Sequence, residues 1–190
     1  MNKDVKNFLI KIYRSLRIFK YSFLSNNRNK EGNYTAHQPV LSNGLGRLVF
    51  GSNVNFGVIN SPKFYSSYAY IEARTQNATI TFGDNVHINN ACSIISEKQI
   101  TIANNVLIGY NCQIADSDFH DLNKNNRLQT DPFPQEVIVS ENVFIGNNVT
   151  ILKGVVIGAN TVVANGSIVT KSFPENVIIG GVPAKILKDL

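Results

Sequence analysis

The chain has 190 residues, of which 43% are hydrophobic and 16% charged, with two cysteines and no tryptophan. This length predicts one domain with an appendage, and a core large enough to need no disulfides. The net charge of +5 is unevenly divided, because residues 1–30 contain eight of the 18 Lys and Arg and only one acid. The rest of the chain is slightly acidic, which argues against a nucleic-acid groove on the main body.

Segment 4–24 is predicted to form an amphipathic helix. Apolar residues recur at i, i+3 and i+4 and make one stripe, formed by Val5, Phe8, Leu9, Ile12, Leu16, Phe19 and Phe23. We favour packing of this stripe on the base of the main body or on a neighbouring subunit. Two alternatives stay open: a basic helix that rests on anionic lipid, and a disordered arm. Along the sequence, basic residues interrupt the N-terminal apolar residues, so we expect no signal peptide, and no segment approaches the roughly 20 apolar residues of a membrane span.

Further along the chain, an aliphatic residue returns every six positions, a period that fits neither a helix nor a strand. The clearest run has Val139, Ile145, Ile151, Ile157, Val163 and Val169 in this position, each of the first five followed three residues later by Asn142, Asn148, Gly154, Asn160 or Gly166. Asn and Gly enter the left-handed backbone region at least cost, so the chain turns a corner every six residues. Three such hexads make one triangular coil, and stacked coils make an all-β solenoid.

The same frame extends upstream to about residue 46. Cys92 and Cys112 fall in its small inward position, which favours buried small hydrophobes over catalytic thiols and fits a reducing compartment. The frame slips by two between Ile94 and Ile102, which predicts a short outward bulge there. It breaks loosely at 60–77 and completely at 116–136. We therefore divide the chain into a basic helical segment, 1–30, and a solenoid, 46–190, with a protruding loop at 116–136.

The loop 116–136 is where we expect chemistry, because long loops in compact repeats are usually functional. It opens with "DSDFHD", where a histidine stands among acids: Asp116, Asp118, His120 and Asp121. A histidine beside carboxylates suits a general base, since its pKa lies near neutral pH. From the residues alone, a solvated histidine is an equal alternative. We expect no metal site, because His37 lies outside the repeat and His87 lies about two coils from His120.

The hexads, this loop and the ending "SIVTKSFPENVIIGGVPAKILKDL" together resemble hexapeptide-repeat acyltransferases over about residues 46–190. The resemblance is to galactoside, maltose and xenobiotic acetyltransferases and to O-acetyltransferases of bacterial surface polysaccharides. It implies a left-handed parallel β-helix, to which we add the N-terminal amphipathic helix and a short C-terminal tail or helix. It also implies a homotrimer with its active sites between subunits. Acetyl-CoA, the acyl donor, would lie in the groove between adjacent solenoids.

The resemblance also assigns roles to individual residues. His120 would be the catalytic base. Substrate-binding residues would be Asn89, with Asn90 as a fallback, Asp116 and Asp118. Contacts to CoA would come from Asn147, Asn165, Thr170, Lys171, Lys185 and Lys188, although Asn165 departs from the small residue usual at its position, and surface solubility is the alternative role for the three lysines.

We therefore expect acetyl-CoA-dependent O-acetylation of a sugar hydroxyl in a bacterial surface polysaccharide. The transfer would be direct, with His120 as the base, in the cytoplasm or at the inner face of the membrane. Two alternatives remain: N-acetylation of a nucleotide-linked amino sugar, and a solenoid scaffold without catalysis. The scaffold is disfavoured because the histidine of the loop and the basic "VTK" and "PAK" stretches are all present.

Overall fold

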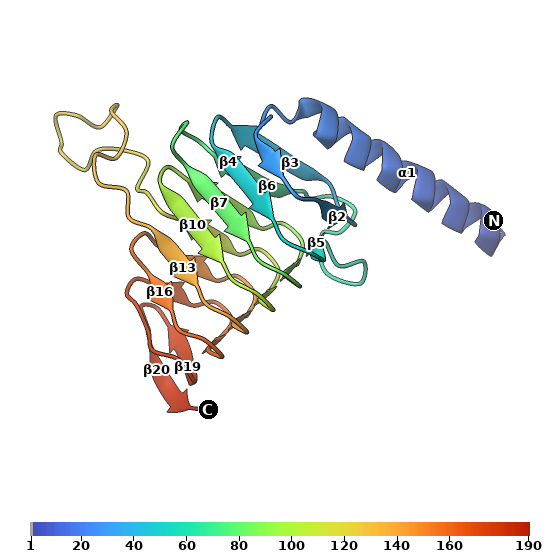
Figure 1. The fold of residues 1–190 in the computed structure, drawn as a ribbon. Helices are drawn as coiled ribbons and strands as arrows, with labels where there is room; N and C mark the ends of the chain where they lie inside the picture. The colour runs from blue at the N-terminus through green and yellow to red at the C-terminus, as the bar shows by residue number, and fades with distance from the viewer. Residues whose placement is uncertain (1) are drawn as a thin grey trace.

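The computed structural model describes residues 2–190, which form one helix followed by twenty strands (Figure 1). Helix α1 spans Lys3–Leu24. The strands are β1 Lys30–Glu31, β2 Tyr34–Ala36, β3 Val40–Gly44, β4 Arg47–Phe50, β5 Val54–Phe56, β6 Ala69–Ala73, β7 Thr79–Phe82, β8 His87–Ile88, β9 Ser93–Ser96, β10 Gln99–Ile102, β11 Leu107–Ile108, β12 Gln113–Ala115, β13 Val137–Val139, β14 Phe144–Ile145, β15 Thr150–Ile151, β16 Val156–Ile157, β17 Val162–Val163, β18 Ile168–Val169, β19 Val177–Gly181 and β20 Ala184–Asp189.

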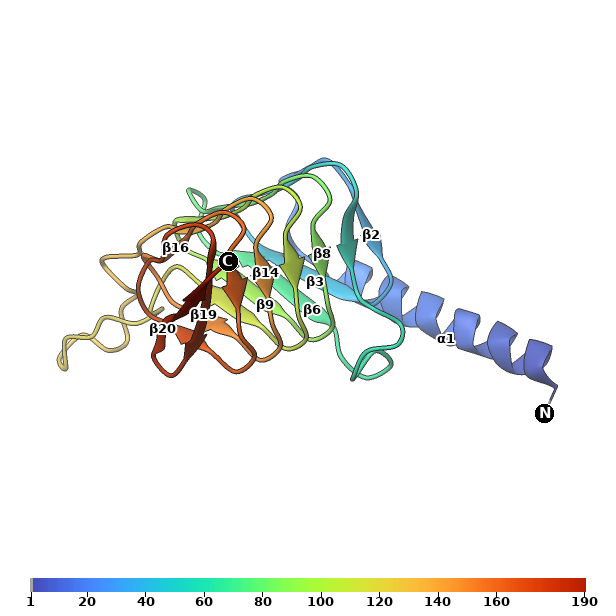
Figure 2. The same ribbon diagram turned by 90° about the horizontal axis from the view of Figure 1, so that it is seen from below.

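Three sheets form the faces of a triangular prism (Figure 2). Sheet A has the order β1-β4-β7-β10-β13-β16, sheet B the order β2-β5-β8-β11-β14-β17-β19-β20, and sheet C the order β18-β15-β12-β9-β6-β3. Neighbouring coils pair in parallel, as in the ladders from β7 through β10 to β13. The chain therefore visits the three faces in turn and climbs by one strand per coil, as the six-residue period predicts.

The corners of the prism confirm the role given to Asn and Gly. All five predicted corner residues of the clearest run have a positive φ, from 56° at Asn142 to 78° at Gly154. At the corner between sheets A and B, the asparagine side chains also bond from coil to coil. Asn142 Nδ2 donates to Asn160 Oδ1 at 2.9 Å, and Asn160 Nδ2 donates to the same oxygen of Asn176 at 2.8 Å. Each such asparagine both turns the chain and joins two coils.

The core is one continuous apolar column inside the prism. The inward side chains of the hexads are fully or almost fully buried, from Phe50 near the N-terminal end to Val169 near the other. The first coils use larger side chains: the rings of Phe50 and Phe82 stack with centroids 5.2 Å apart and planes 3° apart. Burial of apolar side chains is the main stabilising term in folding. In a solenoid each coil contacts only its neighbours, so this burial comes from the stacking of adjacent coils.

The structure differs from the expected boundaries at three places. The coil begins upstream of residue 46, since β1, β2 and β3 already belong to the three sheets. Part of the segment 60–77 is strand β6, so the loose break reduces to a loop before it and a short turn after it. The C-terminal residues form neither a tail nor a helix but β20, which pairs antiparallel with β19.

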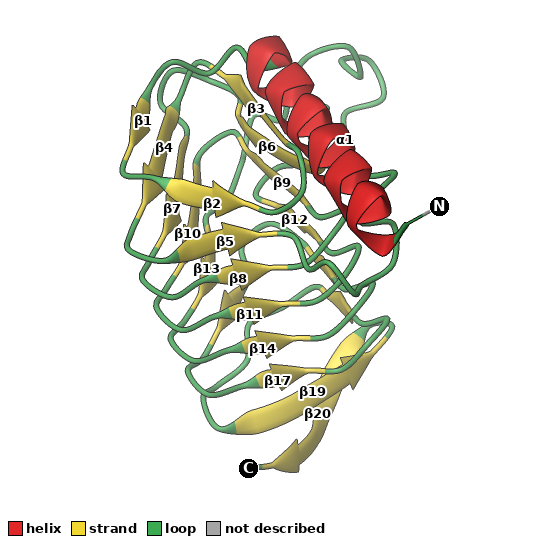
Figure 3. Ribbon diagram, turned by 90° about the vertical axis from the view of Figure 1, so that its right-hand side faces the viewer, coloured by secondary structure: helices red, strands yellow, loops and turns green. Residues whose placement is uncertain are grey.

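Helix α1 lies beside β3 at the N-terminal end of the prism (Figure 3), and its own N-terminus points away from the sheets (Figure 1). Its C-terminus is fixed by Ser25, whose Oγ donates to Tyr21 O and accepts from the backbone N–H of Ser42 at 3.0 Å. Asn27 is also buried and donates to Gly46 O. Within residues 2–190, no helix has the length and apolar character needed to span a bilayer.

Candidate active site

The loop 116–136 leaves sheet C after β12 and returns to sheet A at β13, so it interrupts one edge of the prism. Asp116, at its start, is fully buried. Its carboxylate accepts hydrogen bonds from the hydroxyl of Ser96 and from the backbone N–H groups of Glu97, Lys98 and Gln99 at 2.6–2.9 Å. These bonds hold a short bulge at Glu97 and Lys98, between β9 and β10, where the frame slips; Glu97 itself is buried and does not point outward as expected. Contrary to the expectation, Asp116 is not available to a substrate.

The base of the loop is held by an ion cluster around Lys153. Its Nζ lies 2.7 Å from Asp118 Oδ2 and 2.6 Å from Asp131 Oδ2. Burial alone would raise the pKa of Asp131, but the hydrogen bonds from Lys153 and from the backbone N–H groups of Asp118 and Phe133 lower that pKa to about 2. Asp118 is thus half of an ion pair, and a contact to substrate would have to share it with Lys153.

A second set of contacts fixes the residue before the histidine. Phe119 has φ of +61°, an uncommon conformation for an aromatic residue. Its backbone N–H donates to Ser117 Oγ at 2.9 Å, and the Arg74 guanidinium lies 4.4 Å from the centre of its ring. Arg74 in turn lies 3.6 Å from Glu97, the buried acid that accepts from Ser117. Backbone strain of this kind is typical of functional positions.

His120 follows directly and is exposed. Its Nδ1 lies 2.9 Å from the carbonyl oxygen of Arg127, across the same loop. A carbonyl oxygen only accepts hydrogen bonds, so Nδ1 must be the protonated nitrogen of the neutral ring. The other nitrogen, Nε2, then has its lone pair free and directed away from this contact. This is the arrangement that a general base requires.

A pocket of about 290 Å³ opens on the outer face of sheet B and is lined by His87, Asn89, Leu107, Phe144 and Asn147, among others. His87, Leu107 and Phe144 are outward residues in register on three neighbouring strands. Asn89 Oδ1 accepts from the backbone N–H of Asn90 at 2.7 Å, and among residues 2–190 its Nδ2 has no acceptor. Asn89 can therefore offer a donor to a ligand in this pocket.

The other asparagines predicted for the site have structural contacts. Asn90 is fully buried; its Nδ2 donates to carbonyl oxygens of the loop before β6, and its Oδ1 accepts from the backbone N–H of Val58. Contrary to the expectation, it cannot contact a substrate. Asn147 Oδ1 accepts from the backbone N–H of Tyr110, and Asn165 Oδ1 accepts from that of Asn147. Both are exposed, so their amide nitrogens remain accessible.

Strand β20 places two predicted lysines on one face. Lys185 pairs with Gly180, and Lys188 pairs with Ile178 across a bulge in the ladder. Paired residues in an antiparallel ladder point to the same face, so both lysines share the face of Ile178. Ile178 is in register with Val162, and Val162 with Phe144 of the pocket. The lysines therefore lie on the outer face of sheet B, closer than the pocket to the C-terminal end of the prism.

The predicted residues thus form two groups on different edges of one chain. Thr170 and Lys171 follow β18 of sheet C, at the same edge as His120, and both are exposed. Asn89, Asn147, Asn165, Lys185 and Lys188 lie on sheet B or at its corner with sheet C. Figure 1 shows the yellow loop leaving the prism on the side away from β2 and β5 of sheet B. One chain does not bring its histidine to its own pocket.

Both cysteines are free and buried in the core, as expected. The Sγ atoms of Cys92 and Cys112 lie 3.1 and 3.0 Å from the carbonyl oxygens of Gly109 and Gly146. The contact with Cys112, together with burial, raises the pKa of Cys92 well above its ordinary value. The same contact lowers the pKa of Cys112, so the two thiols share burial but not a raised pKa. Because neither thiol is accessible from the surface of the prism, an acyl-cysteine intermediate is not supported.

Comparison with known proteins agrees with this architecture. The family model described as "Bacterial transferase hexapeptide (six repeats)" matches residues 136–171. A Saccharomyces cerevisiae protein provisionally named an acetyltransferase is 34% identical over 144 residues, which cover 76% of this chain and 68% of the yeast protein. The chain belongs to the hexapeptide-repeat acetyltransferases.

Two Escherichia coli members of this acetyltransferase family are also similar. Galactoside O-acetyltransferase is 34% identical over 68% of this chain and 59% of its own length. A provisionally named O-acetyltransferase of lipopolysaccharide biosynthesis is 35% identical over 57% of this chain and 60% of its own. The chain therefore spans about three-fifths of the length of these two relatives.

A solved structure of the same family confirms the fold. The hexapeptide-repeat acetyltransferase of Vibrio cholerae, complexed with acetyl-CoA, superposes with a TM-score of 0.57 at 25% identity and covers 93% of this chain and 77% of its own. The expected left-handed parallel β-helix is thus the fold of this acetyltransferase chain.

Sequence reasoning missed the cluster that anchors the histidine loop, notably Lys153, Asp131 and Arg74. A lysine at a hexad corner is usually solvated, and Asp131 lies in a polar loop where acids are common. One signal was available: Ile114 pairs with Ile151 in the next coil. Two residues further along, the same register places Lys153 next to the start of the loop. The partners on the loop itself depend on its fold, which the repeat does not determine.

Proposed function

We propose that this chain is an acetyl-CoA-dependent O-acetyltransferase that acetylates a sugar hydroxyl, in the modification of a bacterial surface polysaccharide. The observation that supports it most is His120, whose Nδ1 contact with the Arg127 carbonyl leaves Nε2 free as a base. The names of the two Escherichia coli relatives support the acceptor class, since one acts on galactosides and the other belongs to lipopolysaccharide biosynthesis.

The proposed reaction is a direct transfer. His120 Nε2 takes the proton of the acceptor hydroxyl, and the oxygen attacks the thioester carbonyl carbon of acetyl-CoA. The C–S bond breaks, and the CoA sulfur leaves with the proton that the imidazolium returns. Backbone N–H groups near the loop stabilise the oxyanion that forms on the carbonyl oxygen. The buried cysteines agree with a mechanism that has no acyl-enzyme.

The two separated groups of residues support a homotrimer as the active form. In a closed ring, the edge with His120 from one subunit can face the pocket with Asn89 of the next. The exposed side chains of Leu107 and Phe144 form an apolar strip beside that pocket, which a neighbouring subunit would cover. Acetyl-CoA would then lie along sheet B, with its phosphates near Lys185 and Lys188. Thr170 and Lys171 of the neighbouring subunit would line the same groove.

This proposal keeps Asn89 as the acceptor contact and His120 as the base, with Asn147 and Asn165 offering amide donors to CoA. Two free buried thiols fit the reducing cytoplasm, where we place the reaction.

The test is release of CoA thiol from acetyl-CoA with a panel of sugars and oligosaccharides, with the product identified by its mass increase. We expect turnover with at least one sugar hydroxyl. His120→Ala should lower kcat by about 10²–10⁴ without changing CoA affinity, because a positioned base is worth that much. His37→Ala, which removes a histidine outside the site, is the control. Near-normal turnover of His120→Ala would show that another group is the base.

A further inference from the structure

Helix α1 is attached to the prism by one side only. Its Tyr13 hydroxyl donates to Tyr65 O at 3.1 Å, the Arg17 guanidinium donates to Phe64 O at 3.1 Å and to Ser67 O at 2.6 Å, and Tyr21 packs on Tyr68 with ring centroids 4.6 Å apart. All four contacts are made to the loop between β5 and β6. This side is therefore fixed to the body.

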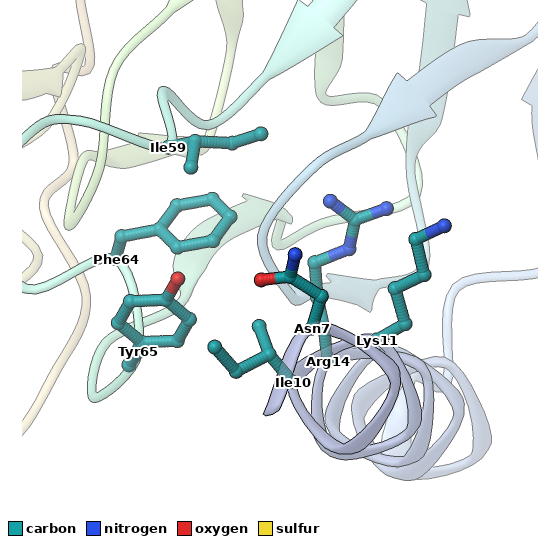
Figure 4. A pocket seen from close by; sticks show the side chains of 7 residues that line it. All are labelled: Asn7, Ile10, Lys11, Arg14, Ile59, Phe64 and Tyr65. Atoms are coloured by element: carbon teal, nitrogen blue, oxygen red, sulfur yellow. The ribbon is translucent and has the colours of Figure 1, made fainter. Parts of the chain in front are cut away.

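The same side of α1 forms one wall of a pocket of about 250 Å³ (Figure 4). Asn7, Ile10, Lys11 and Arg14 come from the helix, and Ile59, Phe64 and Tyr65 face them from the loop. The helical residues that are partly buried, Ile10, Arg14, Arg17, Ile18 and Tyr21, all lie on this side. With 3.6 residues per turn, the apolar stripe defined above lies on the opposite side.

The apolar stripe is not covered by the body of its own chain, contrary to the first of the two packings that we favoured; the second was packing on a neighbouring subunit. None of the residues of α1 is buried. The seven side chains of the stripe are 41–77% exposed, and the two most exposed, Phe19 and Phe23, are 70% and 77% exposed. A continuous exposed stripe that includes three phenylalanines marks an interaction surface. Because the other side of α1 is fixed to the loop, the stripe is held facing away from the prism.

The charge of α1 indicates what the stripe would contact. The helix has six Lys and Arg and one acid, Asp4. Within residues 2–190, none of these six cations forms a salt bridge, since all five pairs in the structure lie elsewhere. By helical spacing, Lys6 and Lys20 border one side of the stripe and Lys11 lies nearest its other side. Unpaired cations beside a Phe- and Leu-rich face are typical of helices that lie in a membrane interface.

We propose that the apolar stripe of α1 binds an anionic phospholipid bilayer, with its helix axis in the plane of the surface. A second copy of the chain fits less well, because pairing of two stripes would bring together two helices with six cations each. Outside α1 the chain has 12 Lys and Arg and 12 Asp and Glu and therefore no net charge, so the net attraction to an anionic bilayer comes from the helix. The proposal does not depend on the acetyl transfer.

The test is co-sedimentation of the full chain with vesicles of phosphatidylcholine, with and without one third phosphatidylglycerol. We expect binding to the anionic vesicles that weakens as salt is added, because salt screens the attraction. The double variant Phe19→Ser, Phe23→Ser should lower the bound fraction by about 10-fold or more, since it removes two of the largest apolar groups. The matched control is Phe133→Ser, which removes an equally exposed phenylalanine, 74% exposed, from the loop 116–136.

Charge is tested separately. Lys6→Gln with Lys20→Gln should reduce binding and its salt dependence, whereas Lys124→Gln, in the exposed loop 116–136, should not. Light scattering without lipid should give the same mass for the wild type and for the Phe19→Ser, Phe23→Ser variant. Failure to bind anionic vesicles, or binding that the stripe variant retains, would overturn the proposal. A lower mass for that variant would also overturn it, because a second copy would then be covering the stripe.

Discussion

At the scale of single residues, two acids of one short motif have different tasks. Asp116 is enclosed and accepts four hydrogen bonds that shape the neighbouring bulge. Asp118, two residues later, is partly exposed and pairs with Lys153. In an extended strand, residues two apart point to the same side, so both acids would have similar surroundings. This alternation ends with β12, and the loop then turns Asp118 to a different side from Asp116. The motif alone could not separate them.

We predict that Asp116→Ala destabilises the fold without a selective effect on substrate binding. Three backbone N–H groups would lose a charged acceptor in a buried place, which costs about 3 kcal/mol or more and lowers Tm by roughly 10 °C. Thermal unfolding monitored by circular dichroism gives Tm, with Asp121→Ala as a control in the same motif. An unchanged Tm together with a raised KM for the acceptor would instead assign Asp116 to the substrate.

The anchor of the loop should be sensitive to acid. The pKa of Asp131 is lowered to about 2 in the folded chain, below the roughly 3.9 of an unfolded aspartate. Its carboxylate therefore stabilises the fold above pH 4, and this contribution is lost as the pH falls through about 2. Asp131→Asn should lower Tm at neutral pH, and the difference from wild type should shrink between about pH 4 and 2. A difference that is independent of pH would contradict this account.

How much of the site was predictable follows from the same residues. His120 could be proposed because a histidine beside carboxylates suits a general base, and the resemblance favoured that role over a solvated histidine. Its contact with the Arg127 carbonyl and the Lys153 cluster could not be predicted, since both depend on how the loop folds back. Asn90 was misplaced because neighbouring residues at a corner point to opposite sides of the chain.

At the scale of elements, the hexad predicted most strands because one residue in six must be inward and one must turn. The six-residue period ends after β18, so the register of the C-terminal hairpin could not be predicted from it. The bulge in β20 places Lys188 on the same face of the sheet as Lys185. For α1, the stripe was predicted correctly, but its direction was not, since a stripe shows which face is apolar and not what covers it.

We predict that Lys185→Ala and Lys188→Ala each raise the KM for acetyl-CoA by about 3-fold, as expected for an exposed charge pair. The double variant should raise this KM further. Added salt should raise the KM of the wild type more than that of the double variant. Steady-state kinetics at two salt concentrations measure both effects, with Lys124→Ala as the control. Equal KM values for all variants would remove β20 from the donor site.

At the scale of the whole molecule, the prism separates its own functional residues. His120 lies at the edge of the prism between sheets C and A, and Asn89 lies at the edge between sheets B and C. A rigid core of stacked coils cannot bend to join them. The site that we propose, with His120 and Asn89 acting together, therefore requires a second subunit, because the triangular cross-section keeps the two residues on different edges.

Mixing two inactive variants tests this account most directly. His120→Ala and Asn89→Ala subunits are combined in equal amounts, unfolded and refolded together, and mixed trimers are verified by native mass spectrometry. Every mixed trimer would contain one site with both native residues, so the mixture should recover about a quarter of wild-type activity. If mixed trimers form and remain as inactive as the separate variants, His120 and Asn89 do not act across a subunit interface, and the proposed site is wrong.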